Sequence, residues 1–244
     1  MRTIRIHVDS PLASGSDIVL PAQAGEHVAR VLRLEAGAPV VLFSGEDGME
    51  YDATLVSVGK REVVAAVGSG RSPGNESPLA LTLAQGVARG EKMDLIVQKA
   101  TELGIARIVP LTTERSEVKL DAARAEKRLA HWRAVAASAC EQSGRARVPA
   151  IEPAVSLSAW LASLGDGGPM RLALLPEGTK RPSELAVADT AILAIGPEGG
   201  FGSRDRAALE ARGFTGLRLG PRILRTETAG LAAIAALQAL YGDL

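Results

Sequence analysis

The sequence predicts an α/β protein in which a small β-barrel precedes a larger domain built on a parallel sheet. Three observations lead to this fold class. Residues 3–67 contain short runs of β-branched and aromatic residues separated by turn signals. A stretch rich in Gly, Ser and Pro follows at residues 68–78, as expected of a linker. From residue 79 onward, predicted strands alternate with predicted helices, which is typical of a parallel sheet. We therefore expect two domains, residues 1–72 and 73–244.

The first domain is predicted from short strands and the glycines between them. We expect strands at residues 40–43, 51–56 and 62–67, with turns at the intervening Gly-containing segments. A short helix is expected at residues 24–34, where aliphatic side chains stand among His27, Arg30 and Arg33. These elements together indicate a small β-barrel.

The second domain is predicted from its alternation of strands and helices. The expected strands are residues 79–87, 107–111, 170–175, 190–195 and 217–219. The expected helices are residues 91–103, 121–140, 203–212 and 228–241. Ser203 is a natural N-cap, and Asp205 suits the first turn of the helix that it begins. The last helix is apolar around most of its circumference, so we expect it to be buried on two sides, with a partner subunit as a candidate for one of them.

Composition and charge are ordinary and do not by themselves indicate a nucleic-acid-binding protein. Hydrophobic residues make up 46% of the chain and charged residues 23%, as is ordinary for a soluble globular protein. Lys and Arg balance Asp and Glu at 28 each, so net charge does not indicate a nucleic-acid binder. Residues 114–149 hold 8 basic and 5 acidic residues, a mild basic stripe that a solvated helix face would also explain.

The first residues and the cysteine content favour a cytoplasmic protein. The start of the chain lacks the apolar block of a signal peptide, and no apolar run reaches the length of about 18 residues that a membrane span needs. The single cysteine, Cys140, cannot form an internal disulfide, and its apolar helical surroundings indicate a small buried residue. The three histidines are isolated and lack metal-ligand spacing, so we expect no metal.

Two strand ends carry the strongest functional signal. Residues 196–201, Gly-Pro-Glu-Gly-Gly-Phe, follow one strand, and residues 220–229 follow the next. Glycines that remove side-chain bulk let the backbone approach a ligand closely, although a tight structural turn would also use them. The loop lacks the Lys-Ser or Lys-Thr pair of a P-loop, and no dinucleotide fingerprint follows the first strand of the domain. Backbone donors beside apolar walls would suit an adenine ring and a sulfonium, but do not single out one cofactor.

Residues 196–201 and 219–229 together resemble the RsmE family, SPOUT-superfamily methyltransferases that act on N3 of a uridine in small-subunit 16S rRNA. Residues 30–33, 89–94, 98–104, 115–119 and 141–145 also match, so the resemblance spans both domains. It implies a PUA-like N-terminal barrel, a SPOUT-type parallel sheet whose chain end threads a trefoil knot, S-adenosylmethionine as cofactor, and a homodimer. One departure is Arg204-Asp205-Arg206, where the family often has Glu in the first turn; we expect only a changed helix start.

The resemblance also implies roles for individual residues. Cofactor-binding residues are expected on three loops: Leu175, Ile195, Gly196, Gly199, Gly200, Leu217, Leu219, Gly220, Leu224 and Thr226. Glu198 is expected to accept backbone N–H bonds from the neighbouring knot loop and hold it in shape; an action on substrate or cofactor is the alternative. Arg145 and Arg225 are the candidate catalytic cations that would stabilise a uridylate anion, although each would equally serve to bind a phosphate or a loop carbonyl.

Recognition of RNA is expected to depend on charge and shape, because aromatic residues make up only 3% of the chain. The candidate phosphate contacts are Arg30, Arg33, Lys92, Lys99, Arg115, Lys119, Arg133, Arg145 and Arg147. The expected partner is 16S rRNA within an assembled 30S subunit. Two alternatives stay open at this point: a related methyltransferase that acts on another RNA, such as a tRNA ribose 2′-OH, and a non-catalytic RNA-binding protein.

Overall fold

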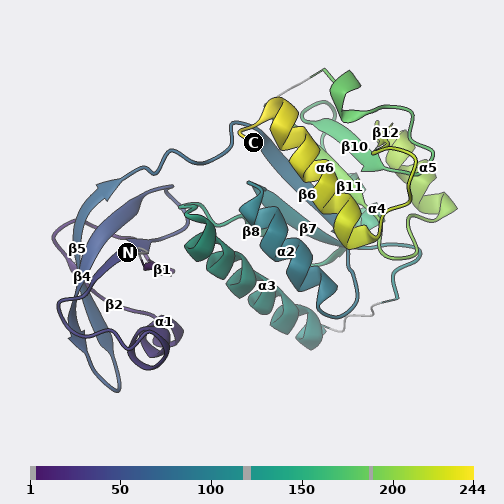
Figure 1. Cartoon of the computed structure of the whole chain (residues 1–244). Helices are drawn as coiled ribbons and strands as arrows, with labels where there is room; N and C mark the ends of the chain where they lie inside the picture. Colours follow the sequence, from purple (N-terminus) through teal and green to yellow (C-terminus); the bar gives the residue numbers. More distant parts are fainter. Residues whose placement is uncertain (1–3, 118–121, 187–188) are drawn as a thin grey trace. The chain divides into compact units, whose positions relative to one another are not determined.

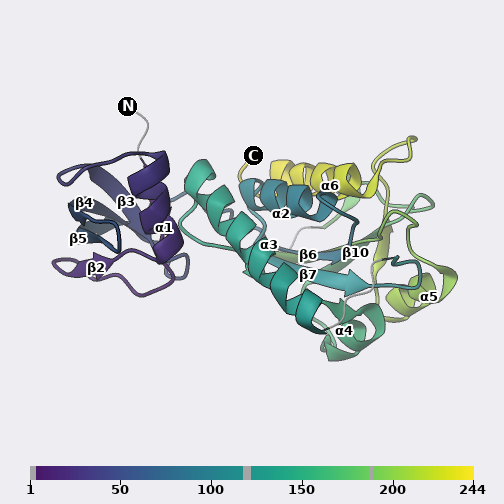
Figure 2. The same cartoon turned by 90° about the horizontal axis from the view of Figure 1, so that it is seen from below.

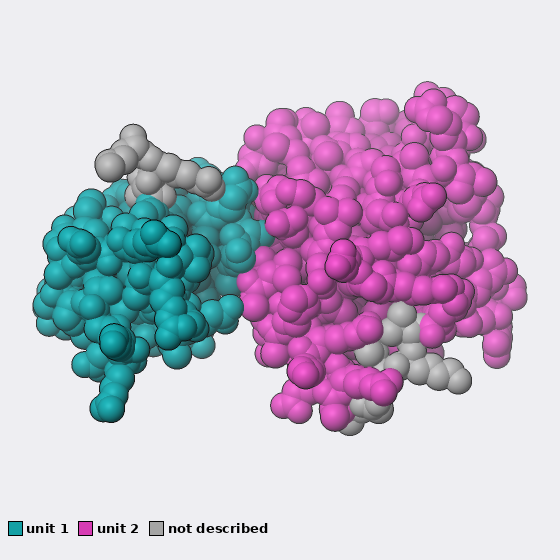
Figure 3. Space-filling model, turned by 60° about the horizontal axis from the view of Figure 1, so that its bottom comes forward, with its two compact units in different colours: residues 1–76, 137–148 teal, residues 77–136, 149–244 magenta. Residues whose placement is uncertain are grey.

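The computed structural model describes residues 4–117, 122–186 and 189–244, which form two compact units. One unit contains the described residues up to Glu76 together with Ala137–Val148, and the other contains Ser77–Ala136 and Pro149–Leu244 (Figure 3). The sequence places the division after residue 72, whereas the contacts place it after Glu76. They also add a segment far along the chain to the first unit, which hydrophobic periodicity does not reveal.

The first unit is built on a five-stranded sheet. Its strand order is β1-β3-β4-β5-β2, in which β1 and β3 are parallel and the other pairs antiparallel. The elements are β1 (Arg5–His7), β2 (Asp17–Val19), α1 (Ala22–Glu26), η1 (His27–Val31), β3 (Pro39–Phe43), β4 (Glu50–Val58) and β5 (Val63–Arg71). The three predicted strands are confirmed, while the three-residue strands β1 and β2 are too short to show alternation. That the sheet is a PUA-like barrel stays a prediction.

The helix predicted at residues 24–34 differs in its second half. The α-helix α1 passes directly into one turn of π-helix, η1, in which the Leu32 N–H donates to the His27 carbonyl at 2.9 Å. The segment then ends because Arg33 adopts a left-handed φ of 52°. The wider turn buries Val28 completely in the core of this unit, together with Leu42 and Ala65.

The second unit is built on a seven-stranded, entirely parallel sheet. Six strands follow the order β12-β10-β11-β6-β7-β8, and β9 also pairs with β7. The strands are β6 (Ala80–Gly86), β7 (Arg107–Thr112), β8 (Ala150–Ile151), β9 (Val155–Ser156), β10 (Met170–Leu174), β11 (Thr190–Ile195) and β12 (Thr215–Leu217). The helical segments are α2 (Lys92–Glu102), α3 (Ala122–Ser143), α4 (Leu157–Ser163), η2 (Pro182–Glu184), α5 (Ser203–Ala211) and α6 (Thr226–Tyr241).

Most predicted elements of this unit are confirmed, with two kinds of error. The short elements β8, β9 and α4 give too little periodicity to be predicted. The strand predicted at residues 217–219 instead occupies Thr215–Leu217. Beyond it, the Arg218 N–H donates to the Lys180 carbonyl at 2.8 Å, and Gly220 turns the chain with a φ of 111°.

Helices cover both faces of the parallel sheet. Helices α2 and α6 lie side by side on one face, and α4 and α5 lie on the other (Figures 1 and 2). Trp160 of α4 packs against Phe214 with ring centroids 5.9 Å apart, within a core cluster that includes Ala84 and Ile192 of the sheet. In the described part of the chain, no helix has both the length and the apolar character needed to cross a membrane.

Gln238 joins the C-terminal end of α6 to the end of α2. Its side chain is completely buried. Its amide group donates to the Leu103 carbonyl at 3.1 Å and accepts from the Ser77 hydroxyl at 2.7 Å. A buried amide that satisfies partners on two other segments fixes the position of α6 more specifically than an apolar side chain would.

We expect Gln238→Leu to lower the free energy of unfolding by about 1–3 kcal/mol, because it leaves the Leu103 carbonyl and the Ser77 hydroxyl without their partner. Urea denaturation followed by circular dichroism measures this change. Gln98→Leu, on the exposed face of α2, is the matched control and should stay within about 0.5 kcal/mol of the wild type. Equal stability of the two variants would contradict the assigned role.

Candidate active site

A pocket of about 570 Å³ lies in the second unit, beyond the carboxyl ends of β10, β11 and β12. This is the edge where parallel α/β sheets bind their ligands. Three segments supply most of its wall: residues 174–176, residues 195–201 and residues 218–227. The two glycine-containing strand ends predicted to form one site do line one pocket.

Glycines are required where these loops approach one another. A Cβ on Gly196 would lie 2.8 Å from the carbonyl carbon of Gly200, closer than real Cβ atoms come to backbone. Gly200 itself has a φ of 66°, a left-handed conformation that L residues rarely adopt. A Cβ on Gly86, at the end of β6, would meet the backbone nitrogen of Pro197 at 2.5 Å. The loop after β11 is therefore folded tightly on itself and against β6.

The N-terminus of α6 is anchored to this loop. The Thr226 hydroxyl donates to the Gly196 carbonyl at 2.6 Å and accepts from the side-chain amide of Gln85 at 3.0 Å. All three groups belong to buried residues. The first turn of α6 therefore has a fixed position at the pocket, and so do the side chains that flank Thr226.

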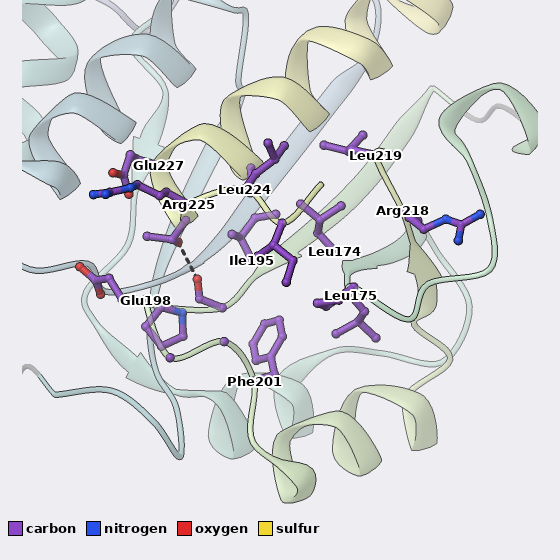
Figure 4. A pocket seen from close by; sticks show the side chains of 18 of the residues that line it. Leu174, Leu175, Ile195, Glu198, Phe201, Arg218, Leu219, Leu224, Arg225 and Glu227 are labelled. Carbon is purple, nitrogen blue, oxygen red and sulfur yellow. Dashed lines mark hydrogen bonds between the residues drawn. The ribbon is translucent and has the colours of Figure 1, made fainter. Parts of the chain in front are cut away.

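The pocket has an apolar part and a charged part, as Figure 4 shows. Aliphatic side chains gather around its middle: Leu174, Leu175, Ile195, Leu219 and Leu224. Three charged side chains lie together at one end, Glu198, Arg225 and Glu227, whereas Arg218 lies on the opposite side of the aliphatic residues. Lys92 of α2 belongs to the same end, because its ammonium lies 3.3 Å from the Glu198 carboxylate and 3.8 Å from that of Glu227.

The Glu198 carboxylate is held by the loop after β6. It accepts a hydrogen bond from the Arg89 backbone N–H at 3.0 Å and one from Lys92 at 3.3 Å. Burial by itself raises the pKa of Glu198, but the N–H groups of Arg89 and of Glu198 itself, together with Lys92, outweigh burial and lower it. The sequence predicts donors from the C-terminal knot loop, whereas the donor in the structure is the loop that follows β6.

A second set of contacts ties the loop after β7 to α5. The Asp205 carboxylate accepts from the backbone N–H groups of Glu114 and Gly202, both at 3.1 Å, and the Glu114 carboxylate accepts from the Arg204 N–H at 3.2 Å. These contacts place Arg115 so that its guanidinium donates to the Gly199 carbonyl at 2.9 Å. Asp205, which belongs to the segment that departs from the family pattern, therefore caps its own helix and holds the loop after β7.

Nine of the ten predicted cofactor residues line the pocket: Leu175, Ile195, Gly196, Gly199, Gly200, Leu219, Gly220, Leu224 and Thr226. Leu217 is not among the lining residues, because its side chain is completely buried within β12. Sequence reasoning did not select Leu174, Phe201 and Glu227, which do line it. Glu227 stands beside the predicted Thr226, and only the folded helix N-terminus shows that it faces the pocket.

The two candidate catalytic arginines lie in different units. Arg225 is exposed and lines the pocket. Arg145 belongs to the first unit, is 5% exposed, and bonds through its guanidinium to Glu76 at 2.7 Å. Its backbone carbonyl also accepts from Arg5. In this chain Arg145 thus forms part of a partly buried ion pair and is not among the residues that line the pocket.

The predicted RNA-contacting residues are mostly exposed and distributed over both units. In the first unit, Arg30 pairs with Glu26, Arg33 is exposed, and Arg147 donates to the carbonyls of Glu46 and Asp47. In the second unit, Lys99 pairs with Glu102 and Arg133 donates to the Ile151 carbonyl, while Lys92 and Arg115 line the pocket. Lys119 lies outside the described residues.

Cys140 and the histidines contribute no chemistry to the pocket. Cys140 is completely buried, and burial raises the pKa of its thiol to about 12, so the nucleophilic thiolate is suppressed. Among the described residues, no group of His, Cys, Asp and Glu side chains could hold a metal ion.

Comparison with known proteins identifies the family. The RNA methyltransferase domain family matches residues 75–238. Ribosomal RNA small subunit methyltransferase E of Bacillus subtilis (strain 168) is 33% identical over 230 residues, which cover 89% of each chain. The chain belongs to this family of RNA methyltransferases. Its Mycobacterium tuberculosis member is 31% identical over 98% of this chain and 93% of its own.

Solved structures of relatives agree with the whole fold. Ribosomal RNA small subunit methyltransferase E from Neisseria gonorrhoeae, solved bound to S-adenosylmethionine, is 36% identical with a TM-score of 0.92, and all of both chains is covered. A Legionella pneumophila protein, also solved with bound S-adenosylmethionine, is 38% identical with a TM-score of 0.95 over all of both chains. Each unit therefore shares its fold with these relatives.

We expect Gly196→Ala to weaken binding of S-adenosylmethionine by about tenfold or more, equivalent to about 1.4 kcal/mol, because the added methyl forces the loop after β11 apart. Isothermal titration calorimetry measures the affinity, with a thermal melt to show that the variant is folded. Gly165→Ala is the matched control, since no atom lies within 4 Å of its added Cβ. Equal affinity of the two variants would show that the loop geometry is not needed for the cofactor.

We expect Glu198→Gln to destabilise the protein in a pH-dependent way. The pKa of Glu198 is lowered from its ordinary value of 4.5, so its contribution to stability is present above that value and is lost as the pH falls through the lower folded-state pKa. The difference in unfolding free energy between wild type and variant should therefore be largest near about pH 7 and shrink toward about pH 3. Urea denaturation across this range measures it; a difference independent of pH would contradict the assignment.

Proposed function

We propose that this protein transfers a methyl group from S-adenosylmethionine to N3 of one specific uridine of 16S rRNA, within the 30S subunit. The observation that carries the proposal is the single pocket formed by residues 196–201 and 218–227, the two segments on which the family resemblance depends. Its curated relatives are named for methylation of small-subunit ribosomal RNA. The position on the base and the identity of the uridine come from the resemblance.

The residues of the pocket fit S-adenosylmethionine. The volume of about 570 Å³ is in the range of small-molecule sites, and the aliphatic residues Leu175, Ile195 and Leu224 would pack against an adenine ring. Close-packed glycines expose backbone N–H and carbonyl groups, which can bind the edge of the ring and the ribose. When bound, this cofactor supplies an electrophilic methyl group on a positively charged sulfur.

Arg225 is the cation best placed to assist the reaction. The N3 nitrogen of uracil has no free lone pair until its proton leaves, and the resulting negative charge spreads to the neighbouring carbonyl oxygens. An exposed guanidinium at the charged end of the pocket would stabilise that charge. Arg145 is paired with Glu76, so its expected catalytic role is not supported by the contacts within this chain.

Binding of RNA would use the exposed basic residues of both units. Lys92 and Arg115 line the pocket, and Arg30, Arg33, Lys99, Arg133 and Arg147, which are not among its lining residues, are further candidates for phosphate contacts. Lys119 keeps the same expected role. A chain with balanced charge needs a large, preformed target to gain enough contacts, which favours the assembled subunit over a short naked strand.

The finer architectural predictions belong to the same proposal. We expect a trefoil knot formed by the C-terminal segment, which is supported by residues 218–226 lining one pocket with residues 174–176 and 195–201. We expect a PUA-like first unit and a homodimer, which is consistent with Leu95 of α2 and Leu240 of α6 being 42% and 48% exposed. The expected compartment is the cytoplasm, where ribosomal subunits are found.

The deciding experiment is transfer of labelled methyl groups to 30S subunits that lack the modification. We expect one methyl group per subunit, recovered as N3-methyluridine after digestion to nucleosides and chromatography. Naked 16S rRNA serves as the comparison substrate and should be methylated more slowly. Label on a ribose, or on another base, would refute the proposed position.

A further inference from the structure

The charged end of the pocket contains two carboxylates in different environments. Among the described residues that line the pocket, Glu198 and Glu227 are the only acidic ones, and no His, Cys or Tyr is present. The cationic Lys and Arg side chains of the lining have no free lone pair with which to accept a proton. A protein group that removes a proton inside this pocket is therefore one of two glutamates.

Glu198 is poorly suited to accept a proton. Two hydrogen bonds, from the Arg89 backbone N–H and from Lys92, already occupy its Oε1 atom. Each of them favours the charged carboxylate, and the pKa of the group is accordingly lowered. Glu198 thus acts as a link between the loop after β11 and the loop after β6.

Glu227 has acceptor capacity left over. Its Oε2 atom is buried and has no hydrogen-bond partner within the described part of the chain. The ammonium of Lys92 lies 3.8 Å away, beyond hydrogen-bond distance. The side chain as a whole is 15% exposed, and it belongs to the pocket wall. This residue of the pocket wall therefore has an unused acceptor, which a donor group on a bound ligand would satisfy.

The position of Glu227 is fixed by the fold. It follows Thr226, whose hydroxyl is bonded to the Gly196 carbonyl and to Gln85 at the base of the site. It lies beside Arg225 at the charged end of the pocket, away from the aliphatic residues that suit an adenine ring (Figure 4). A uracil bound at this end would thus have a cation for its carbonyl oxygen and a carboxylate for its N–H.

We propose that Glu227 is the general base that accepts the N3 proton of the target uridine. This inference rests on the proposed function. As the proton passes from N3 to the Glu227 carboxylate, the nitrogen electron pair forms the new N–C bond to the methyl carbon. The electrons of the broken C–S bond stay on sulfur as a neutral thioether, and the protonated Glu227 releases its proton to solvent after the product leaves.

Lys92 has a defined part in this arrangement. Its ammonium bridges the two carboxylates, with Glu198 at 3.3 Å and Glu227 at 3.8 Å. It thereby offsets the repulsion between two negative groups at one end of a pocket. Because it hydrogen-bonds only Glu198, it leaves the Glu227 carboxylate available to the substrate.

The test is Glu227→Gln, assayed with 30S subunits that lack the modification. We expect kcat to fall by about 10²–10⁴-fold, the range for loss of a general base. Without the base, reaction depends on uridine ionised by solvent, so kcat of the variant should rise by about tenfold per pH unit below the pKa of N3, a steeper dependence than that of the wild type. Affinity for S-adenosylmethionine, measured by calorimetry without RNA, should stay within about twofold.

Two further variants make the test specific. Glu227→Asp keeps a carboxylate and should retain more activity than Glu227→Gln, with the wild-type pH dependence. Glu210→Gln, on the exposed side of α5, changes a glutamate outside the pocket and should not change kcat. Weakened binding of S-adenosylmethionine by Glu227→Gln, with an unchanged pH dependence, would assign Glu227 to the cofactor and overturn the inference.

Failure of this inference is distinguishable from failure of the proposed function. If the wild-type protein forms N3-methyluridine and Glu227→Gln does so at the same rate, the function stands and the role of Glu227 is refuted. If the wild-type protein methylates a different atom, the proposed function fails before any variant is compared.

Discussion

The buried contact between Thr226 and the Gly196 carbonyl is the interaction on which the pocket depends. It joins the start of the last helix to the loop after β11, two segments that lie 30 residues apart in the sequence. Gln85, at the end of β6, completes it. Because these groups are shielded from water, loss of one would leave the others unsatisfied, and the geometry is therefore maintained. The apolar and charged parts of the pocket take their positions from this junction.

The charged end illustrates how environment separates two chemically identical groups. Glu198 accepts hydrogen bonds at Oε1 from the Arg89 backbone N–H and from Lys92, so its carboxylate is a structural link. Glu227 is a few ångströms from the same ammonium but is not hydrogen-bonded by it. Sequence alone offers Glu198 as the more conspicuous residue, because it stands among glycines. The contacts instead single out Glu227 as the carboxylate with an unused acceptor.

Arg145, by contrast, is a residue that the sequence selects as a catalytic candidate and that the fold pairs with a carboxylate. Its position in a basic stretch favours contact with RNA or substrate, and nothing in the local sequence indicates a partner. The fold brings Glu76, 69 residues away, to its guanidinium and buries Arg145 within the first unit. The same unit incorporates Ala137–Val148, which contains the C-terminal end of α3 and the residues that follow it. Contacts of this range have no signature in a linear pattern.

The sequence by itself determined the parallel sheet, most of its strands and helices, the two loops of the pocket and the family. These features depend on local chemistry: hydrophobic periodicity, helix caps, and glycines at positions where the backbone needs close approach. Only the tertiary structure decided that Leu217 faces the core, that Glu198 is held by Arg89 and that Glu227 keeps a free acceptor. Such assignments depend on which distant segment arrives beside a side chain, and that follows from packing of the whole unit.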